Sequence, residues 1–310
     1  MTSPTPLAIQ TQGLGKRFGA RAALDGVDLE VPRGVAFGFL GANGAGKTTL
    51  IRLLLGLARP TSGTMRLLGR ELPGGSAEAL ARVGAIIEEP RFHRHLSGRE
   101  NLHVNAAARD RSAHGRVDAA LERVGLVHRS DDRVRTYSMG MRQRLGIARC
   151  LMADPELLIL DEPMNGLDPA GILEFRNLIR DFVDEGRTVM LSSHILDEVE
   201  KTCDRVAIVD RGEIVLSGSL DELRREGKPR VLIEVDAPTK ARTLLAGVPG
   251  VLALSGDDGV IEASLADVDL VPELNRRLVE SGIPVRRLEP VRASLEERFL
   301  AITSRLEDVA

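Results

Sequence analysis

The sequence predicts an α/β fold followed by a smaller α+β domain, and three observations support this. Short apolar runs alternate with amphipathic segments from Leu7 to Asp210, as strands and helices do in a layered α/β domain. One glycine-rich loop, Gly41 to Thr49, stands between an apolar run and a helical segment. A polar stretch at residues 227–229 precedes a new alternating run, so we place a domain boundary between residues 226 and 227.

Length and composition agree with two domains. The chain has 310 residues, of which 43% are hydrophobic, and this is enough to fill one large core and a second, smaller one. Its formal net charge of -3 provides no basic field, so no nucleic-acid partner is expected. Cys150 and Cys203 stand far apart, without a C-x-x-C spacing or a histidine cluster, which predicts free, buried thiols.

The N-terminal residues bear on location. They lack the basic region and the apolar run of a signal peptide, and no later stretch approaches the ~18 apolar residues that a spanning helix needs. We therefore expect the chain to be made and kept in the cytoplasm.

The residues after the boundary, 227–310, predict an accessory module. The alternation of the first domain fades after Glu213, and a new set of elements follows. These are a strand at 231–236, a helix at 239–246, strands near 250–254 and 259–264, a helix at 268–281 and a strand at 284–288. Their β-α-β-β-α-β order is that of a ferredoxin-like domain. The closing segment Ala293 to Thr303 spaces its apolar residues along one face, which predicts a docking helix.

The glycine-rich loop predicts a site for a polyphosphate. It follows the apolar run Val35 to Leu40 and precedes the helical run Leu50 to Leu55, and it has the form G-x-x-x-x-G-K-T. The N–H groups of such a loop and the positive end of the helix dipole cradle phosphates, and Lys47 adds a charge for the β- and γ-phosphates. The nucleotide-binding residues predicted here are Gly41, Ala42, Asn43, Gly44, Ala45, Gly46, Lys47, Thr48 and Thr49.

A second motif predicts a metal ligand and a general base. Leu157 to Leu160 has the composition of a buried strand, which delivers Asp161 to the carboxyl edge of a parallel sheet. Thr48 and Asp161 are predicted to hold Mg²⁺, which bridges the β- and γ-phosphates of ATP. Glu162 is the predicted general base for the attacking water. An ordinary core strand that ends in acids is the alternative, and the upstream loop favours the catalytic interpretation.

The segment Tyr137 to Met141 resembles the signature sequence of ATP-binding-cassette proteins. Of the family's usual L-S-G-G-Q, it keeps the serine as Ser138 and the second glycine as Gly140. The resemblance implies that these two residues bind the γ-phosphate of a nucleotide held by another subunit, so that two copies form a homodimer around ATP. A plain N-cap of a buried helix is the alternative role for Ser138.

Other residues extend the resemblance over roughly residues 7–225. It implies a P-loop NTPase cassette, with a RecA-like core and a helical subdomain at about residues 90–150. Phe18 is expected to stack on adenine, and an ordinary core aromatic is the alternative. His194 is expected to contact the γ-phosphate and to orient the attacking water, as a third catalytic residue beside Glu162 and Lys47.

Glu88 departs from the family pattern, which commonly has glutamine at this position. The family residue contacts Mg²⁺ and the attacking water, so the resemblance places Glu88 with the metal ligands Thr48 and Asp161. A carboxylate repels phosphates and attracts Mg²⁺, and the sequence does not determine which effect dominates.

The segment that follows Glu88 is the expected docking surface for a membrane protein. In the family it receives helices of a separate permease subunit, which implies contacts near Phe92, His93 and Leu96 and a location on the cytoplasmic side of the membrane. A solvated charged loop from Arg91 to Arg99 is the alternative.

The closing S-L-E-E-R-F-L segment and the pattern Ile86 to Pro90 resemble exporter ATPases of the bacitracin- and daunorubicin-resistance type. This implies a subunit that hydrolyses ATP and drives efflux of an antibiotic, a drug or a lipid-like compound. Two alternatives stay open. One is a soluble cassette ATPase that acts on ribosomes or nucleic acid, and the other is an ATP-dependent switch in which Glu88 prevents ATP turnover. The single phosphate loop argues against the first, and Glu162 argues against the second.

Overall fold

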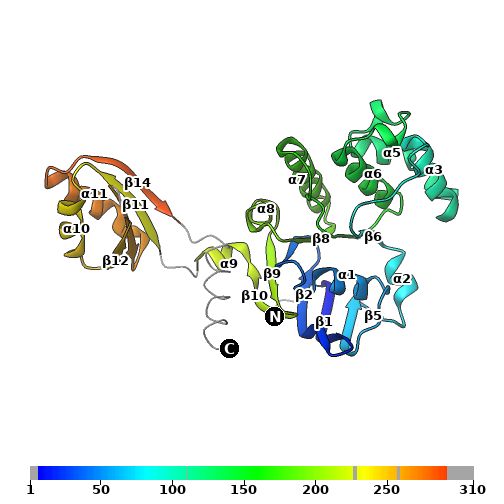
Figure 1. Ribbon diagram of the computed structural model, residues 1–310, viewed down its shortest axis with the longest axis horizontal. Helices are drawn as coiled ribbons and strands as arrows, with labels where there is room; N and C mark the ends of the chain where they lie inside the picture. The colour runs from blue at the N-terminus through cyan, green and yellow to red at the C-terminus, as the bar shows by residue number, and fades with distance from the viewer. Residues whose placement is uncertain (1–5, 110, 226–228, 257–258, 292–310) are drawn as a thin grey trace. The chain divides into compact units, whose positions relative to one another are not determined.

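The computed structural model describes residues 6–109, 111–225, 229–256 and 259–291. The chain divides into two compact units, Met1–Ser219 and Leu220–Ala310, and each is considered by itself. Figure 1 labels most of the helices and strands of both.

The first unit is built on a central six-stranded sheet (Figure 1). Its strands, from one edge to the other, are β10 (Glu213–Ser219), β9 (Arg205–Asp210), β3 (Ala36–Leu40), β8 (Thr188–Ser193), β7 (Leu157–Leu160) and β6 (Val83–Ile86). All neighbours are parallel except the edge strand β10, which confirms the predicted α/β fold. The alternation extends further than expected, because β10 begins at Glu213 and pairs with β9. Strands β3, β7 and β8 are buried throughout, as strands covered on both faces are.

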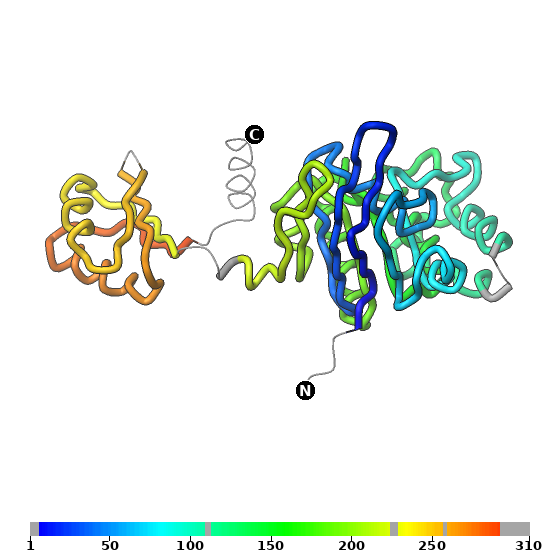
Figure 2. The backbone as a smooth tube through the Cα atoms, turned by 90° about the horizontal axis from the view of Figure 1, so that it is seen from below, coloured from blue at the N-terminus to red at the C-terminus, as the bar shows by residue number. Residues whose placement is uncertain are grey.

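An antiparallel sheet packs on the central one through a shared apolar core. Its strands, in order, are β2 (Arg21–Pro32), β1 (Leu7–Phe18), β4 (Ser62–Leu67) and β5 (Arg70–Leu72). The long strand β1 crosses the first unit (Figure 2). Helix α1 (Lys47–Leu54) belongs to the same core, which contains Ile9, Leu29, Phe39, Leu50 and Met190. Because removing such side chains from water is the main driving force of folding, this core holds α1 in place.

The other helices of the first unit form two groups. One group follows β6 and consists of α3 (Gly98–Arg109), α4 (Arg111–His114), α5 (Val117–Arg123) and α6 (Met139–Leu151), with the 3₁₀ turns η1 (Val127–Arg129) and η2 (Val134–Thr136) between α5 and α6. Figure 1 shows α3, α5 and α6 lying together to one side of the central sheet. The second group, α7 (Pro169–Asp184) and α8 (Leu196–Thr202), contacts β3 and the strands beside it. The short helix α2 (Ser76–Leu80) precedes β6.

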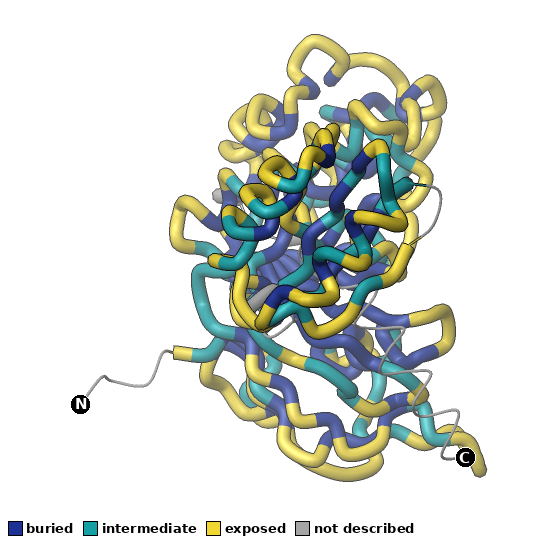
Figure 3. Tube along the Cα trace, turned by 90° about the vertical axis from the view of Figure 1, so that its left-hand side faces the viewer, coloured by how far each residue is buried: buried dark blue, intermediate teal, exposed yellow. Residues whose placement is uncertain are grey.

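The second unit has the predicted ferredoxin-like order. After α9 (Leu220–Arg225), its elements are β11 (Arg230–Val235), α10 (Pro238–Ala246), β12 (Val251–Ser255), β13 (Val260–Leu265), η3 (Val268–Leu270), α11 (Val271–Glu280) and β14 (Val285–Val291). The sheet order is β12-β13-β11-β14, and all neighbours are antiparallel. Alternate residues of β11 and β13 are buried against α10 and α11, in a core that includes Val231, Ile233, Ile261 and Leu274. Figure 3 looks onto this unit and shows exposed residues along its helices and loops.

Two predicted helices of the second unit are α11 and the closing helix. The helix expected at residues 268–281 begins with the 3₁₀ turn η3, and the α-helix starts at Val271, with Pro272 in its first turn. The predicted closing helix, Ala293 to Thr303, lies outside the described residues.

Neither cysteine forms a disulfide and both are buried, as predicted. Burial raises the pKa of the Cys203 thiol, because the thiolate would lose its hydration. As for the membrane, no helix in the described part of the chain is both long enough and apolar enough to cross it.

We predict that Leu274→Ala destabilises the second unit by about 2–5 kcal/mol, because Leu274 is fully buried and its removal leaves a cavity. Hydrogen exchange of peptides from β11 and β13 measures this loss. The matched control is Leu252→Ala on β12, where the side chain is 53% exposed and we expect a change of about 0.5 kcal/mol or less. Equal effects of the two variants would contradict the assigned core.

Candidate active site

The glycine-rich loop joins the buried strand β3 to helix α1. Gly46 has φ 115°, and a Cβ atom there would lie 2.5 Å from the carbonyl oxygen of Ala23. At Gly41 a Cβ atom would lie 2.4 Å from the carbonyl oxygen of Val209. Only glycine fits these two positions, so the loop turns tightly and brings its N–H groups to the N-terminus of α1.

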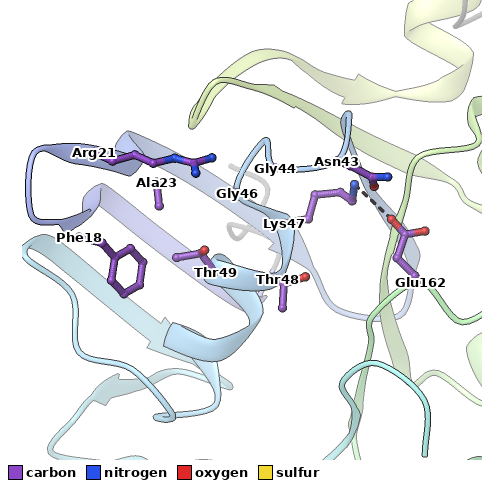
Figure 4. A pocket seen from close by; sticks show the side chains of 10 residues that line it. All are labelled: Phe18, Arg21, Ala23, Asn43, Gly44, Gly46, Lys47, Thr48, Thr49 and Glu162. Carbon is purple, nitrogen blue, oxygen red and sulfur yellow. Dashed lines mark ion pairs between the residues drawn. The ribbon is translucent and has the colours of Figure 1, made fainter.

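Lys47 begins α1, and its side chain is only 6% exposed. Its Nζ donates to the carbonyl oxygens of Gly41, at 2.6 Å, and Ala42, at 3.3 Å. It also lies 3.1 Å from Glu162 Oε1 (Figure 4). The loop's own carbonyls and one carboxylate therefore hold the ammonium group in the place that the sequence predicted for phosphate binding.

Asp161 follows β7 and is buried, with 3% of its surface exposed. Ser192, at the end of the neighbouring strand β8, donates to Asp161 Oδ1 at 2.5 Å. Thr48 donates to Asp161 Oδ2 at 2.9 Å. Both carboxylate oxygens are thus fixed, and the structure brings together the two residues that the sequence assigned to Mg²⁺.

Glu162 stands one residue further on, with a positive φ of 47°. Its N–H donates to Ser192 Oγ at 2.9 Å, which supports this costly backbone conformation. Glu162 Oε2 lies 2.9 Å from His194 Nδ1, so the tautomer with a proton on Nδ1 donates to it. Glu162 Oε1 is buried and forms an ion pair with Lys47 Nζ at 3.1 Å that lacks hydrogen-bond geometry. The carboxylate is thus held by Lys47 on one oxygen and by His194 on the other.

Lys47, Thr48 and Glu162 line a hollow of about 440 Å³ beside the phosphate loop (Figure 4). Phe18 and Arg21, from the β1–β2 hairpin, lie at one end of it, and Lys47 and Glu162 lie at the other. Phe18 is 58% exposed, and Lys16 Nζ lies 4.9 Å from the centre of its ring. This exposure excludes the alternative of an ordinary core aromatic and leaves a ring face open beside the phosphate loop.

The residues around the loop fit a magnesium ion. Mg²⁺ prefers oxygen ligands and usually takes one or two from the protein, while phosphates and water supply the rest. Thr48 Oγ1 and the Asp161 carboxylate are such ligands, 2.9 Å apart. No group of three or more His, Cys, Asp or Glu side chains that could hold a metal occurs among the described residues. The protein therefore offers a partial coordination shell, which a bound nucleotide would complete.

Glu88 is engaged elsewhere. Its Oε1 lies 2.9 Å from Arg52 of α1, and its side chain is 63% exposed. Like Glu162, it has a positive φ, 59°. The next residue, Glu89, accepts a hydrogen bond from Arg142 Nε at 3.0 Å. A role for Glu88 as a metal ligand stays a prediction, and in this arrangement its charge is offset by Arg52.

Ser138 and Gly140 lie at a second hollow, of about 380 Å³, together with Gly166, Leu167 and Asp168. Ser138 caps α6, because its Oγ accepts from the N–H of Met141 at 3.2 Å. The simple capping role is therefore real, and it leaves the end of α6 facing the hollow. Neither Ser138 nor Gly140 lines the hollow around the phosphate loop, so one chain holds the two halves of the expected site apart.

The side chain of Tyr137, the residue before Ser138, is buried. Its Oη donates to the carbonyl oxygen of Arg129 at 2.6 Å. Burial raises the pKa of this phenol, which keeps it protonated and able to donate. Tyr137 therefore anchors the start of the signature segment in the helical group.

The predicted permease contacts lie between β6 and α3. Phe92 and Leu96 are half-buried, and His93 is exposed. The Phe92 ring lies 5.3 Å from the guanidinium of Arg149 on α6, and the N–H of His93 donates to Asn101 Oδ1 at 2.8 Å. Phe92 and His93 therefore hold the segment against the helical group, while Arg91 and Arg94 are exposed, so permease docking and the solvated loop both stay predictions.

Comparison with known proteins agrees with this geometry. Residues 24–165 match the ABC transporter family, and residues 218–303 match the C-terminal domain of DrrA1-3-like ATP-binding proteins. The ABC transporter ATP-binding protein YdbJ of Bacillus subtilis is 41% identical to this chain, and the alignment covers 96% of this chain and 95% of YdbJ. The chain belongs to the ABC transporter ATP-binding family. Members of this family hydrolyse ATP to power transport.

Two further relatives of this ABC ATP-binding protein carry functional names. The bacitracin transport ATP-binding protein BcrA of Bacillus licheniformis is 39% identical over 95% of this chain and 96% of its own length. The daunorubicin/doxorubicin resistance ATP-binding protein DrrA of Streptomyces peucetius is 34% identical over 99% of this chain and 95% of its own. A solved ATP-binding subunit of an ABC transporter has a TM-score of 0.63 at 30% identity, and covers 71% of this chain and 92% of that one.

Several residues of the site were missed by sequence reasoning. Ser192 orients Asp161, and the only signal for it is a hydroxyl side chain near the end of a strand. Arg21 lines the hollow and Arg52 pairs with Glu88, and no pattern in the sequence points to either. Such residues act through contacts made in the folded protein.

We predict that Phe18→Ala weakens the binding of ATP and of GTP by about 1–3 kcal/mol, the range measured for aromatic stacking on a base. Both nucleotides are expected to lose affinity equally, because a ring face does not read the hydrogen-bonding edge of a base. The measurement is equilibrium binding of fluorescent ATP and GTP analogues. Phe18→Trp, which keeps a flat ring, is the control; unchanged affinity in Phe18→Ala would contradict stacking.

We predict that Ser192→Ala lowers kcat about 10–100-fold, the usual effect of removing a group that orients a metal ligand. Steady-state hydrolysis measured as a function of Mg²⁺ concentration tests this. Ser193→Ala is the matched control, because the Ser193 side chain bonds only within its own loop, where its Oγ accepts from the N–H of Ile195 at 3.0 Å. If Ser193→Ala is as defective as Ser192→Ala, the assignment of Ser192 is wrong.

Proposed function

We propose that two copies of this chain close around two molecules of ATP·Mg²⁺ and so drive a separate membrane permease. The observation that carries the proposal is the separation of the two half-sites, with Lys47 in one hollow and Ser138 in another of the same chain. Each half is a phosphate-binding device at the start of a helix, and a head-to-tail pair of chains brings unlike halves together. The dimeric ATP-binding cassette MJ0796 bound to ADP and phosphate shares the fold, with a TM-score of 0.61 over 68% of this chain and 98% of that one, at 20% identity.

The roles of the residues follow from their positions. Lys47 and the loop N–H groups bind the β- and γ-phosphates, and Thr48 and Asp161 hold Mg²⁺, which offsets charge that develops on the transferred phosphoryl group. Glu162 takes a proton from the attacking water as the general base. His194, bonded to Oε2, orients that carboxylate.

Ser138 and Gly140 complete the site from the second copy. The N-terminus of α6 carries the positive end of its dipole, and the Ser138 hydroxyl can turn toward a γ-phosphate. After hydrolysis the phosphate leaves, the attraction between the half-sites is lost, and the two copies separate. Opening and closing of this kind is what a permease can use.

The cargo is proposed to be an antibiotic, a drug or a lipid-like compound that is exported from the cell. Support comes from the named relatives, bacitracin transport BcrA and daunorubicin/doxorubicin resistance DrrA, which align over nearly the whole chain. The permease would dock on the surface of Phe92, His93 and Leu96, and the chain would then work at the cytoplasmic side of the membrane. Residues 227–310 are proposed to form the accessory domain of such an exporter.

The test is ATP hydrolysis measured against protein concentration, with gel filtration of Glu162→Gln in ATP. We expect the rate to rise more steeply than the concentration, because two chains form each site. Glu162→Gln is expected to lose about 10²–10⁴-fold in kcat, the contribution of a general base, and to form an ATP-stabilised dimer. The control is Glu71→Gln, at an exposed position of strand β5. A monomer that hydrolyses ATP at the full rate would refute the proposal.

A further inference from the structure

Two adjacent acids, Glu88 and Glu89, reach two different helices. Glu88 pairs with Arg52 of α1 at 2.9 Å, and Glu89 pairs with Arg142 of α6 at 3.0 Å. Helix α1 begins with Lys47, and α6 begins directly after Ser138. The two acids therefore connect the helix of the phosphate loop with the helix of the signature segment.

Arg142 extends this connection to the signature segment itself. While its Nε donates to Glu89, its Nη1 donates to the carbonyl oxygen of Tyr137 at 2.8 Å. Tyr137 is the residue before Ser138, so one guanidinium ties Glu89 to the backbone that presents the serine. The fork of donors on arginine makes this two-sided contact possible, and lysine could not reproduce it.

The middle of α6 also packs on the same segment. Gly146 has no side chain, and a Cβ atom there would lie 3.0 Å from both Ile86 and Pro90. The segment thus contacts α6 at two places, at Gly146 by close packing and at Arg142 by charge. Two separate contacts therefore join this segment to α6.

The Glu89–Arg142 pair also affects the charge at the start of α6. Arg142 lies in the first turn of α6, where the helix dipole disfavours a cation, and α6 has no acid in that turn. Glu89 offsets this cation beside Ser138. The side chains of Arg142 and Glu89 are 28% and 58% exposed, so the pair itself contributes little to folding stability.

We propose that the Glu89–Arg142 pair positions Ser138 for the nucleotide held by a second copy of this chain, while Glu88–Arg52 anchors the same segment to the phosphate-loop helix. Arg142 is a positioning residue here, because it acts through the backbone before Ser138. The inference rests on the proposed function, since Ser138 meets a nucleotide only in the dimer.

The experiment uses the full chain with Glu162→Gln, so that ATP binds without being hydrolysed. Sedimentation at a series of protein concentrations gives the dimerisation constant in ATP, and a fluorescent ATP analogue gives the Kd of the dilute monomer. Glu89→Ala and Arg142→Ala are each expected to weaken dimerisation about fivefold or more, the usual scale of coupling between sites. The monomer Kd is expected to stay unchanged, because neither side chain lines the phosphate hollow.

A double-mutant cycle distinguishes two coupled residues from two residues that act independently. If the pair acts as a unit, the double variant of Glu89→Ala and Arg142→Ala dimerises no more weakly than Arg142→Ala alone. Arg142→Lys is then expected to dimerise with intermediate strength. Arg66→Ala and Glu71→Ala remove another exposed pair, 3.5 Å apart between β4 and β5, and are expected to leave dimerisation unchanged. Thermal unfolding of every variant verifies that it is folded.

Three outcomes would overturn the inference. Additive or absent effects would show that the two residues do not act together. Tighter dimerisation in Glu89→Ala, with weaker dimerisation in Arg142→Ala, would show that Arg142 meets the phosphate directly and that Glu89 only masks it. If the Glu162→Gln parent does not dimerise in ATP, the proposed function fails as well, and this result is distinct from the other two.

Discussion

The active site depends on the position of one buried carboxylate, that of Asp161. Burying a charge is costly unless it is hydrogen-bonded, and here each oxygen accepts one bond. The donors, Thr48 and Ser192, come from α1 and β8, so the carboxylate ties three elements together. Thr48 follows Lys47 at the start of α1, and Ser192 also accepts from the N–H of Glu162. The phosphate loop and Glu162, the proposed general base, are therefore positioned through the same acid.

Two residues at or near the site, Glu162 and Glu88, have strained backbone conformations. Glu162 and Glu88 are two of the few described residues other than glycine with a positive φ, and each lies two residues after the end of a parallel strand, β7 or β6. Such a conformation costs of order 1–3 kcal/mol and persists only where surrounding contacts hold it. At Glu162 the contacts come from Ser192 and His194, and at Glu88 from Arg52. The core of buried strands provides the stability that offsets this cost.

The separation of the two half-sites is the reason that we propose a second copy. Lys47 and Ser138 line different hollows, although each stands at the start of a helix suited to bind phosphate. The ion pairs of Glu88 and Glu89 run between those helices inside one chain. Coupling between nucleotide binding and dimerisation then requires no long pathway, because one short segment contacts both α1 and α6.

Much of the fold and of the candidate site could be predicted from the sequence, for a physical reason. The phosphate loop, the Asp161–Glu162 pair and the signature segment are local motifs, in which neighbouring residues set the turn, the cap and the strand end. The alternation of apolar runs likewise predicts the parallel sheet and the ferredoxin-like order, because it reports which faces must be buried. The lengths of β10 and of the turn before α11 were harder to predict, since they depend on pairing and on how a helix starts.

Only the tertiary structure decided which side chains meet across the fold. Ser192 is 31 residues from Asp161, Arg52 is 36 from Glu88, and Arg142 is 53 from Glu89, so no local pattern links the partners. The structure also decided that Phe18 is exposed and that Ser138 stands apart from Lys47. The sequence by itself determined the chemistry available to this protein, because that chemistry lies in short motifs. The packing of strands and helices determined which groups act together, because contacts between distant segments form only when the core does.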